Sequence, residues 1–165
     1  MTSYKQKLKI HIKNNRWAKG SFPSTPEGEE VFTITNERFH KALDKFPDLK
    51  DRIEIFIDWD EDSFNTSMAT TDILLTWNFP TANLIRTAPK LKWIHCISAG
   101  VEHLLPMDWL PDEVILTNNK GVHSKKSGEY GLMSVLMLHN PLPAIVSNQQ
   151  IKKYKQIYGT PISDS

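Results

Sequence analysis

Five short apolar runs recur along the sequence, and the segments between them are long enough to form helices. The runs lie at residues 8–12, 53–57, 72–77, 91–97 and 114–117. Strands that alternate with helical segments of roughly 10 to 15 residues are typical of a parallel sheet covered on both faces. The pattern therefore predicts an α/β fold, specifically a flavodoxin-like, doubly wound parallel sheet of five strands.

The first and third runs carry different patterns. In the first, apolar residues alternate with polar ones such as His11, which predicts a strand with one buried face. We expect the lysines in and before this run to lie in solvent: Lys5, Lys7, Lys9 and Lys13. The third run is more continuously apolar, so we expect it near the middle of the sheet.

Helices are predicted between these strands. Thr35 or Asn36 can cap a helix that ends before the second strand. Residues 61–69 predict a weak helix, and Pro80 can start another. Residues 14–31 contain glycines and prolines whose positions predict a long loop.

After the fifth strand the pattern changes. A mostly apolar helix is predicted from Lys125 to the prolines at 141 and 143, followed by a more polar helix over 148–158. An apolar helix that leads out of a domain suits a connector between two packed bodies. We therefore expect a folded domain at 1–123, connector helices at 124–158 and a frayed tail at 159–165.

Charge and cysteine content argue against several classes of protein. The formal net charge is +1 over 165 residues, which gives no sign of a nucleic-acid partner. Cys96 is the single cysteine, so no intramolecular disulfide can form, and its apolar neighbours favour a buried, unreactive thiol. No apolar stretch is long enough to span a bilayer and the N-terminus lacks a secretion signal, so we expect a cytoplasmic protein with no membrane partner.

A candidate anion site follows the fourth predicted strand. Residues 98–101 read Ser-Ala-Gly-Val and lie at the carboxyl edge of the sheet, where doubly wound folds bind ligands. Gly100 permits a positive φ. Such a turn can aim successive backbone amides at one anion, and a carboxylate is the expected ligand. From spacing alone, an ordinary strand-to-helix turn is the simpler interpretation.

Residues 91–130 resemble the substrate-domain end of the D-isomer-specific 2-hydroxyacid dehydrogenases, of the glyoxylate/hydroxypyruvate reductase type. The similarity runs in order from 72 to 154. Its segments are the 98–101 turn with Glu102-His103-Leu104 after it, 116–123, 127–130, and Asn148 with the glutamines that precede Tyr154. Two residues depart from the family pattern: Lys126 stands near a position where many relatives carry Ser or Thr, and Gly128 stands in place of Ala.

The resemblance assigns one wall of a substrate cleft to this chain. It implies that the backbone amides of Ala99, Gly100 and Val101 hold the carboxylate of a 2-keto or 2-hydroxy acid. It also places Trp77 and Asn78 at the substrate mouth, where the indole would cover an apolar tail and the amide would hydrogen-bond. Packing of aromatic side chains at the sheet edge is the competing interpretation of this segment.

Three histidines suggest a metal site or acid–base chemistry, but their contexts favour structural roles. His95 alternates with apolar partners and has no Cys or carboxylate at ligand spacing. His103 falls in a short surface helix, and His123 also favours a structural role. The resemblance implies that the family's catalytic His, together with an Arg and a Glu, lies farther along in the nucleotide-binding domain. We therefore expect no catalytic and no metal-binding residue in this chain.

The sequence contains no dinucleotide-binding motif. Its seven glycines never occur as G-x-G, so the motif G-x-G-x-x-G is absent. We expect no cofactor on this chain alone, whereas the resemblance implies NAD(H) or NADP(H) in the complete enzyme. The expected function is that of the substrate-domain part, at 1–123, of an NAD(P)-dependent D-2-hydroxyacid dehydrogenase. We expect a truncated product, a split gene or a fragment that is not catalytic by itself.

Two other functions fit less of the sequence. One is a non-catalytic carboxylate-binding or protein-interaction module derived from the same domain, and the helix over 130–138 would then bind a separate nucleotide-binding domain or a second copy of the chain. The other is a phosphorylation-dependent receiver. That class needs acidic residues after the first and third strands, where this chain has Lys-Asn-Asn at 13–15 and Thr-Trp-Asn at 76–78.

Overall fold

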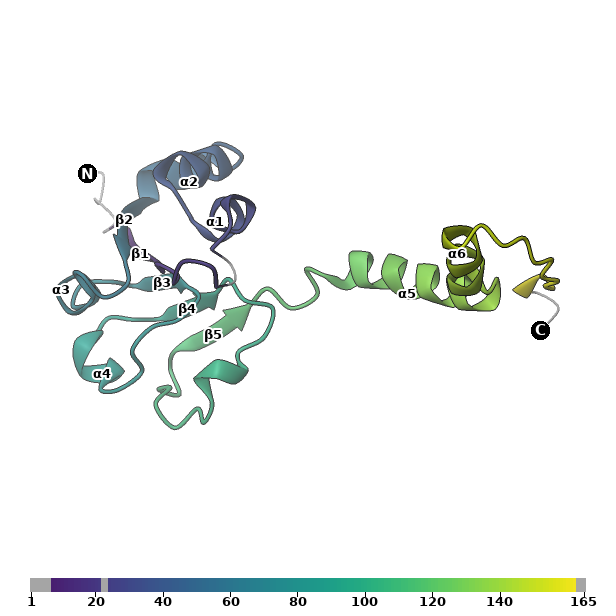
Figure 1. The fold of residues 1–165 in the computed structure, drawn as a ribbon. Helices are drawn as coiled ribbons and strands as arrows, with labels where there is room; N and C mark the ends of the chain where they lie inside the picture. Colours follow the sequence, from purple (N-terminus) through teal and green to yellow (C-terminus); the bar gives the residue numbers. More distant parts are fainter. Residues whose placement is uncertain (1–6, 22–23, 163–165) are drawn as a thin grey trace. The chain divides into compact units, whose positions relative to one another are not determined.

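The computed structural model describes residues 7–21 and 24–162, and it contains a five-stranded, all-parallel sheet (Figure 1). The strands are β1 (Leu8–Asn14), β2 (Ile53–Trp59), β3 (Ile73–Thr76), β4 (Trp93–Cys96) and β5 (Ile115–Asn118). Their order is β2-β1-β3-β4-β5, which is the flavodoxin-like doubly wound order. The predicted fold class is confirmed, and β3 is the middle strand, as its continuous apolar run predicts.

Helices connect the strands. They are α1 (Pro26–Phe32), α2 (Asn36–Leu43), α3 (Phe64–Met68), α4 (Leu84–Thr87), α5 (Ser124–His139) and α6 (Leu142–Gln150), with short 3₁₀ helices η1 (Pro47–Arg52) and η2 (Glu102–Leu104). Along the sheet, the chain moves from β1 to β2 in one direction and then from β2 through β3 and β4 to β5 in the opposite direction. Because crossovers between parallel strands are right-handed, a reversal of direction moves the connecting helices to the other face of the sheet. α1 and α2 therefore cover one face of the sheet, and α3 and α4 cover the other.

The predicted loop over 14–31 is wrong in its second half, which forms α1. The Thr25 hydroxyl accepts a hydrogen bond from the Gly28 backbone amide at 3.1 Å, and Pro26 occupies the first helical position, where its missing N–H costs nothing. The cap predicted for the next helix is confirmed, because the Thr35 hydroxyl accepts a hydrogen bond from the Arg38 amide at 3.2 Å.

Two other helix predictions are wrong in position. α4 begins at Leu84 rather than Pro80, after Asn83 turns the chain with a φ of 58°. The last helix, α6, spans Leu142–Gln150 rather than the predicted 148–158. Pro143 lies in its first turn and does not interrupt it. That helix ends where Lys152 adopts a φ of 53°.

The core of the sheet lies around β3 and β4. It is built from buried apolar residues: Phe64, Met68, Leu74, Phe79, Leu84, Ala88, Leu91, Ile94, Cys96, Leu104 and Val114. The expectation that β1 exposes its polar face holds for Lys7 and, in part, for Lys9, but it is wrong for the carboxyl half, where His11 is 0% exposed and Lys13 is 3% exposed. The last four residues of β1 are all buried, so both faces of the strand are covered there. Lys5 lies outside the described residues.

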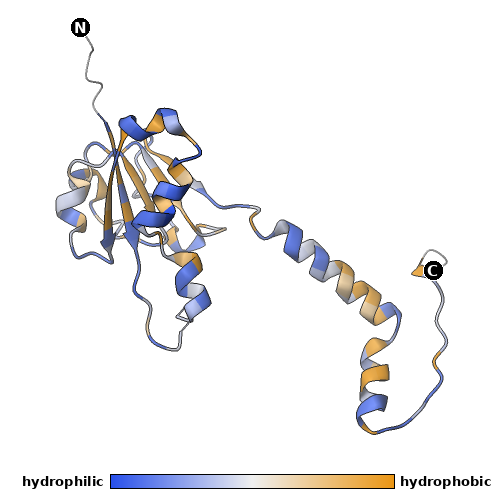
Figure 2. Cartoon of the chain, turned by 90° about the horizontal axis from the view of Figure 1, so that it is seen from above, coloured by the Kyte–Doolittle hydropathy of each residue, from blue (hydrophilic) through white to orange (hydrophobic). Residues whose placement is uncertain are grey.

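The chain divides into two units, residues 1–120 and 121–165. The first unit holds the sheet and the core. The second holds α5 and α6, and in its described part, up to residue 162, no residue is buried. Figure 2 shows apolar residues in the second half of α5 and the start of α6. Across the ranges that the structure describes, no helix is long and apolar enough to cross a membrane. Residues 163–165 of the predicted tail lie outside those ranges.

Candidate functional site

The 98–101 turn lies at the carboxyl end of β4 and is fixed at its first residue. The backbone carbonyl of Ser98 accepts a hydrogen bond from the Asn119 amide at 2.9 Å, and the Ser98 hydroxyl donates to the Gly100 carbonyl at 2.6 Å. Ser98 itself is buried, whereas Ala99 is exposed and Gly100 is half-buried. The turn therefore has a rigid start and an open end at the edge of the sheet.

Three successive backbone amides in this turn make no hydrogen bond within the described residues. Within residues 7–21 and 24–162, the N–H groups of Ala99, Gly100 and Val101 donate to no protein acceptor. Exposed backbone donors in sequence at a strand end can bind an anion. The role of these amides in substrate binding stays a prediction.

Gly100 has a different surrounding from the one predicted. Its φ lies outside the positive range that glycine alone favours, so the expected left-handed turn is wrong. A Cβ atom on Gly100 would instead lie 2.1 Å from Oε2 of Glu102, which is the first residue of η2. The glycine leaves room for this carboxylate beside the turn, and a larger residue would displace the Glu102 side chain.

Trp77 and Asn78 follow β3, whose last residue pairs with that of β4. The Trp77 indole packs edge-on against Phe32 and Trp17, with ring centroids 4.9 Å and 5.6 Å away. The Asn78 side chain is exposed, and its Oδ1 accepts a hydrogen bond from the Phe79 amide at 3.0 Å. The indole thus belongs to an aromatic cluster, and within residues 7–21 and 24–162 the Asn78 amide nitrogen donates to no protein acceptor.

Two side chains from distant segments hold the backbone of this 77–79 loop. Nε2 of His103, two residues after Val101, lies 2.9 Å from the Trp77 carbonyl, and since a carbonyl only accepts, Nε2 carries the proton. Nζ of Lys13 donates to the Asn78 carbonyl at 2.8 Å. Burial lowers the pKa of Lys13, while Asp60, Glu61 and Asp58 act in the opposite direction. The sequence pattern assigned both residues to the surface, and no local signal marked these contacts.

The other predicted structural residues lie beside β4. His95 contacts the Thr117 hydroxyl through Nδ1 at 2.9 Å and Oδ1 of Asn119 through Nε2 at 3.2 Å, so both ring nitrogens serve the β4–β5 pairing. Cys96 is fully buried, and burial raises the pKa of its thiol to about 11, which keeps it protonated and unreactive. In the ranges the structure covers, no cluster of His, Cys, Asp and Glu could hold a metal ion.

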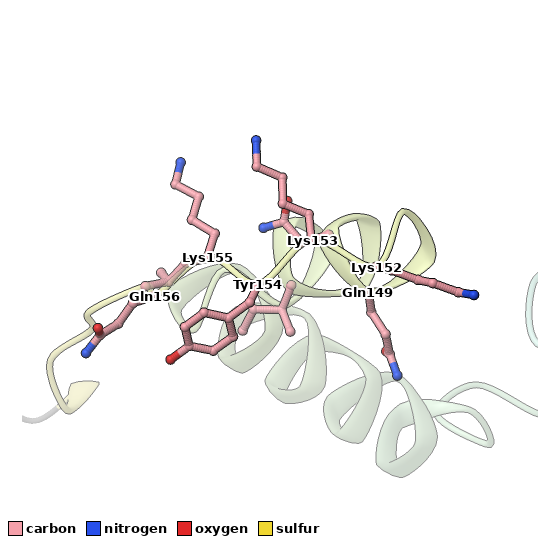
Figure 3. A pocket seen from close by; sticks show the side chains of 9 residues that line it. Gln149, Lys152, Lys153, Tyr154, Lys155 and Gln156 are labelled. Carbon is pink, nitrogen blue, oxygen red and sulfur yellow. The ribbon is translucent and has the colours of Figure 1, made fainter.

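The second unit contains a pocket of its own, with a volume of about 650 Å³. Figure 3 shows that it is formed by the end of α6 and the segment that follows, with Lys153 and Lys155 on one side and Tyr154 on another. None of the predicted site residues lines it. In the first unit, a pocket of about 390 Å³ does reach the candidate site, because Asn78, Phe79 and His103 are among its lining residues.

Solved structures that resemble this chain in fold include 2-hydroxyacid dehydrogenases. A probable 2-hydroxyacid dehydrogenase from Rhizobium etli CFN 42, in complex with NADP, HEPES and L(+)-tartaric acid, matches 93% of this chain at 22% identity and a TM-score of 0.56. A D-isomer specific enzyme from Xanthobacter autotrophicus Py2, in complex with NADPH and MES, matches 97% at 14% identity and a TM-score of 0.59. The NADPH-dependent glyoxylate/hydroxypyruvate reductase of Sinorhizobium meliloti matches 96% at 19% identity and a TM-score of 0.56.

The chain spans less than half of each of these enzymes, between 42% and 44% of their length. At such identities the likeness shows a common fold. In sequence, 64 residues are 38% identical to a Streptomyces coelicolor protein described as an uncharacterized protein in the mprR 3′ region, and they cover 22% of it. No family model matches the chain. The chain thus has the fold of part of a 2-hydroxyacid dehydrogenase.

Proposed function

We propose that residues 1–123 are the substrate-binding part of an NAD(P)-dependent D-2-hydroxyacid dehydrogenase. In this proposal the amides of Ala99, Gly100 and Val101 hold the carboxylate of a small 2-keto or 2-hydroxy acid. The observation that carries it is the row of three free amides at the carboxyl end of β4, in a sheet whose solved neighbours are such enzymes. Trp77 and Asn78 would flank the rest of the acid.

The chemistry of the turn supports an anionic ligand. A carboxylate has two acceptor oxygens, and hydrogen bonds from backbone N–H groups to a charged acceptor are stronger than those to a neutral one. The Glu102 carboxylate already lies beside Gly100, so a second negative charge at the turn must displace it or approach from the open side. This chain's contribution is to bind and orient the acid; it supplies no acid–base residue for the reaction.

The described residues do not fit a dinucleotide. The turn after β1, where a doubly wound sheet can carry a glycine-rich phosphate loop, holds Arg16 instead, and its guanidinium pairs with Asp60 at 2.8 Å and Asp62 at 2.9 Å. The chain also lacks the motif G-x-G-x-x-G. In this proposal NAD(H) or NADP(H) belongs to another part of the complete enzyme, together with the catalytic residues.

The test is a titration of the ¹⁵N-labelled chain with pyruvate, glyoxylate and glycerate, followed by NMR. Saturable shifts of the 99–101 amides support the proposal. Pyruvamide, which replaces the carboxylate by a neutral amide, is the matched ligand control and should give no saturable shift. If pyruvate and pyruvamide perturb the same amides equally, the carboxylate is not the group recognised and the proposal is wrong.

Ala99 offers a matched pair of variants, because its side chain is exposed and can change without repacking. Ala99→Asp places a negative charge beside the amides and should weaken pyruvate binding roughly tenfold by repulsion. Ala99→Asn has nearly the same shape without the charge, so its affinity should stay within about twofold of the original. Equal affinities of the two variants would contradict an anion at this turn.

The exposed apolar side chains of α5 support a second part of the proposal. Leu132 is 62% exposed and Leu138 is 73% exposed, and surfaces of this kind mark contacts with other protein parts. We assign α5 as the connector that packs against the nucleotide-binding part of the complete enzyme. A protein-interaction module without catalysis is the alternative that this surface also favours.

Dye binding and gel filtration test the assignment of α5. The chain by itself should bind a hydrophobic dye or self-associate, and Leu138→Lys should reduce both. A chain that is monomeric at high concentration and binds no dye would contradict the assignment. Association into a defined dimer that Leu138→Lys abolishes would identify a second copy as the partner instead.

A further inference from the structure

The 77–79 loop is held by donors from two different strand ends, and neither contact is needed to build the sheet. Lys13 at the end of β1 donates to the Asn78 carbonyl at 2.8 Å. His103 in η2 donates to the Trp77 carbonyl at 2.9 Å. Two consecutive carbonyls of one loop are thus fixed from opposite sides, one by the strand beside β3 and one by the helix that follows the 98–101 turn.

Holding the loop with a buried lysine costs stability. Its side chain is 97% removed from solvent, since Lys13 is 3% exposed, and its ammonium group makes its hydrogen bond to a neutral carbonyl. A buried charge without a closely paired carboxylate costs stability. The Thr76 hydroxyl lies 3.0 Å from the same Asn78 carbonyl and also 3.0 Å from the Lys13 carbonyl, so the three residues form one network.

The histidine connects the loop to the candidate carboxylate site. His103 follows Val101 by two residues, and the Val101 carbonyl accepts the hydrogen bond from the Leu104 amide that closes the η2 turn. A shift of the loop therefore pulls on the same short turn that ends the row of free amides. The pocket between the loop and η2 has Asn78, Phe79 and His103 among its lining residues, so a change in this contact changes the space beside Asn78.

We propose that Lys13 and His103 are positioning residues that fix the 77–79 loop relative to the amides of Ala99, Gly100 and Val101, so that a keto acid meets a preformed cleft wall. This inference rests on the proposed function. It adds that affinity depends on two hydrogen bonds to main-chain carbonyls, and that the substrate touches neither of the two donors. Lys13 acts through Asn78, and His103 acts through Trp77.

Removing the lysine should separate affinity from stability. Lys13→Met keeps the length and apolar stem of the side chain but removes the charge and the donor. Its unfolding midpoint in urea should stay the same or rise, because a desolvated charge is gone. Its affinity for pyruvate, measured by NMR titration, should fall roughly three- to tenfold, as expected for the loss of one positioning hydrogen bond. A residue with a merely structural role would lower stability and leave the affinity of the folded protein unchanged.

The matched control for the lysine is Lys9→Met. Lys9 is on the same strand, but its ammonium group lies 4.0 Å from Glu54 at the surface and contacts no part of the loop. This variant should bind pyruvate as the original chain does. If Lys9→Met and Lys13→Met weaken binding equally, general loss of positive charge explains the effect and the positioning role is overturned.

The histidine allows a rescue experiment that does not depend on Lys13→Met folding. His103→Gln keeps an N–H donor at nearly the position of Nε2, whereas His103→Met has a similar length and no donor. Affinity should fall roughly three- to tenfold in His103→Met and recover in His103→Gln. Equal affinity of the two variants overturns the inference and leaves the proposed function standing. If the original chain binds no keto acid, the proposed function fails first, and this inference fails with it.

Discussion

The two units of this chain differ in which side chains they bury and which they expose. The unit at 1–120 buries polar groups: His11 is 0% exposed, and Lys13 and Thr76 lie beside it in the covered interior of the sheet. The unit at 121–165 exposes apolar groups, including Leu132 at 62%. α5 carries seven apolar residues among its 16, so their exposure reflects what the helix has to pack against and not a polar composition.

This contrast indicates how each unit is stabilised. In a parallel sheet every central strand has a neighbour on each side and a layer of structure over each face, so even a lysine on such a strand can be buried. α5 has 16 residues and α6 has 9, and neither contains a buried residue. Helices of that length without a packed face are marginal in water. The first unit should be stable by itself, whereas the second should depend on a partner surface.

A matched pair of leucine substitutions gives the largest expected effect. Leu74 is fully buried in β3, so Leu74→Ala should lower the free energy of unfolding of the first unit by about 2–5 kcal/mol. Leu132→Ala in α5 makes the same chemical change at an exposed site and should cost less than about 0.5 kcal/mol. All five tryptophans lie in the first unit, so urea unfolding followed by tryptophan fluorescence reports on it alone. Equal costs for the two substitutions would show that α5 contributes to the stability of the first unit.

Acid should weaken the first unit through His11. Burial lowers the pKa of His11 to about 4, while Asp58 acts to raise it and Lys13 to lower it. Below pH 6.5 the unfolded chain takes up a proton that the folded chain does not bind until about pH 4, so stability falls as the pH falls through this window. Between pH 7 and pH 5 the loss should be about 2 kcal/mol.

His11→Phe is the variant that isolates this effect. The His11 ring already packs between Phe56 and Phe64, with centroids 5.3 Å and 5.8 Å away, so another flat ring fits the surroundings. The difference in free energy of unfolding between variant and original should grow from pH 7 to pH 5, measured by urea titrations at each pH. A difference that does not change with pH would mean that His11 takes up its proton at the same pH in the folded and the unfolded chain, with Asp58 at 4.0 Å offsetting the effect of burial.

The fold could be predicted because its signals are local. Each strand is a short run of apolar or β-branched residues, and their alternation with helical segments is enough to indicate a parallel sheet. The errors in the helix predictions occur where one residue type is typical of two different structures. The sequence pattern treats Pro26 and Pro143 as breaks, but each stands in the first turn of a helix, where proline is favoured.

The candidate site was predictable only in part. The position of the 98–101 turn follows from the end of a strand, but the contacts that hold its surroundings join distant residues. His103 and Trp77 are 26 positions apart, and Lys13 and Asn78 are 65 positions apart. Periodicity within a strand cannot show such pairs. It also predicted Lys13 in solvent, because alternation indicates which face a residue is on and not whether that face is covered.

The smallest expected effect comes from a substitution inside α5, which tests the stability of the second unit. Gly128 lies inside α5, and a Cβ atom there would meet nothing within 4 Å, so Gly128→Ala should favour the helix by about 1 kcal/mol. The ellipticity at 222 nm should increase, while the fluorescence midpoint of the first unit stays unchanged. Gly121→Ala is the control, because a φ of 87° makes alanine unfavourable there. If Gly128→Ala also shifts the fluorescence midpoint, the two units share stability, and the contrast between a self-sufficient sheet and a dependent pair of helices is wrong.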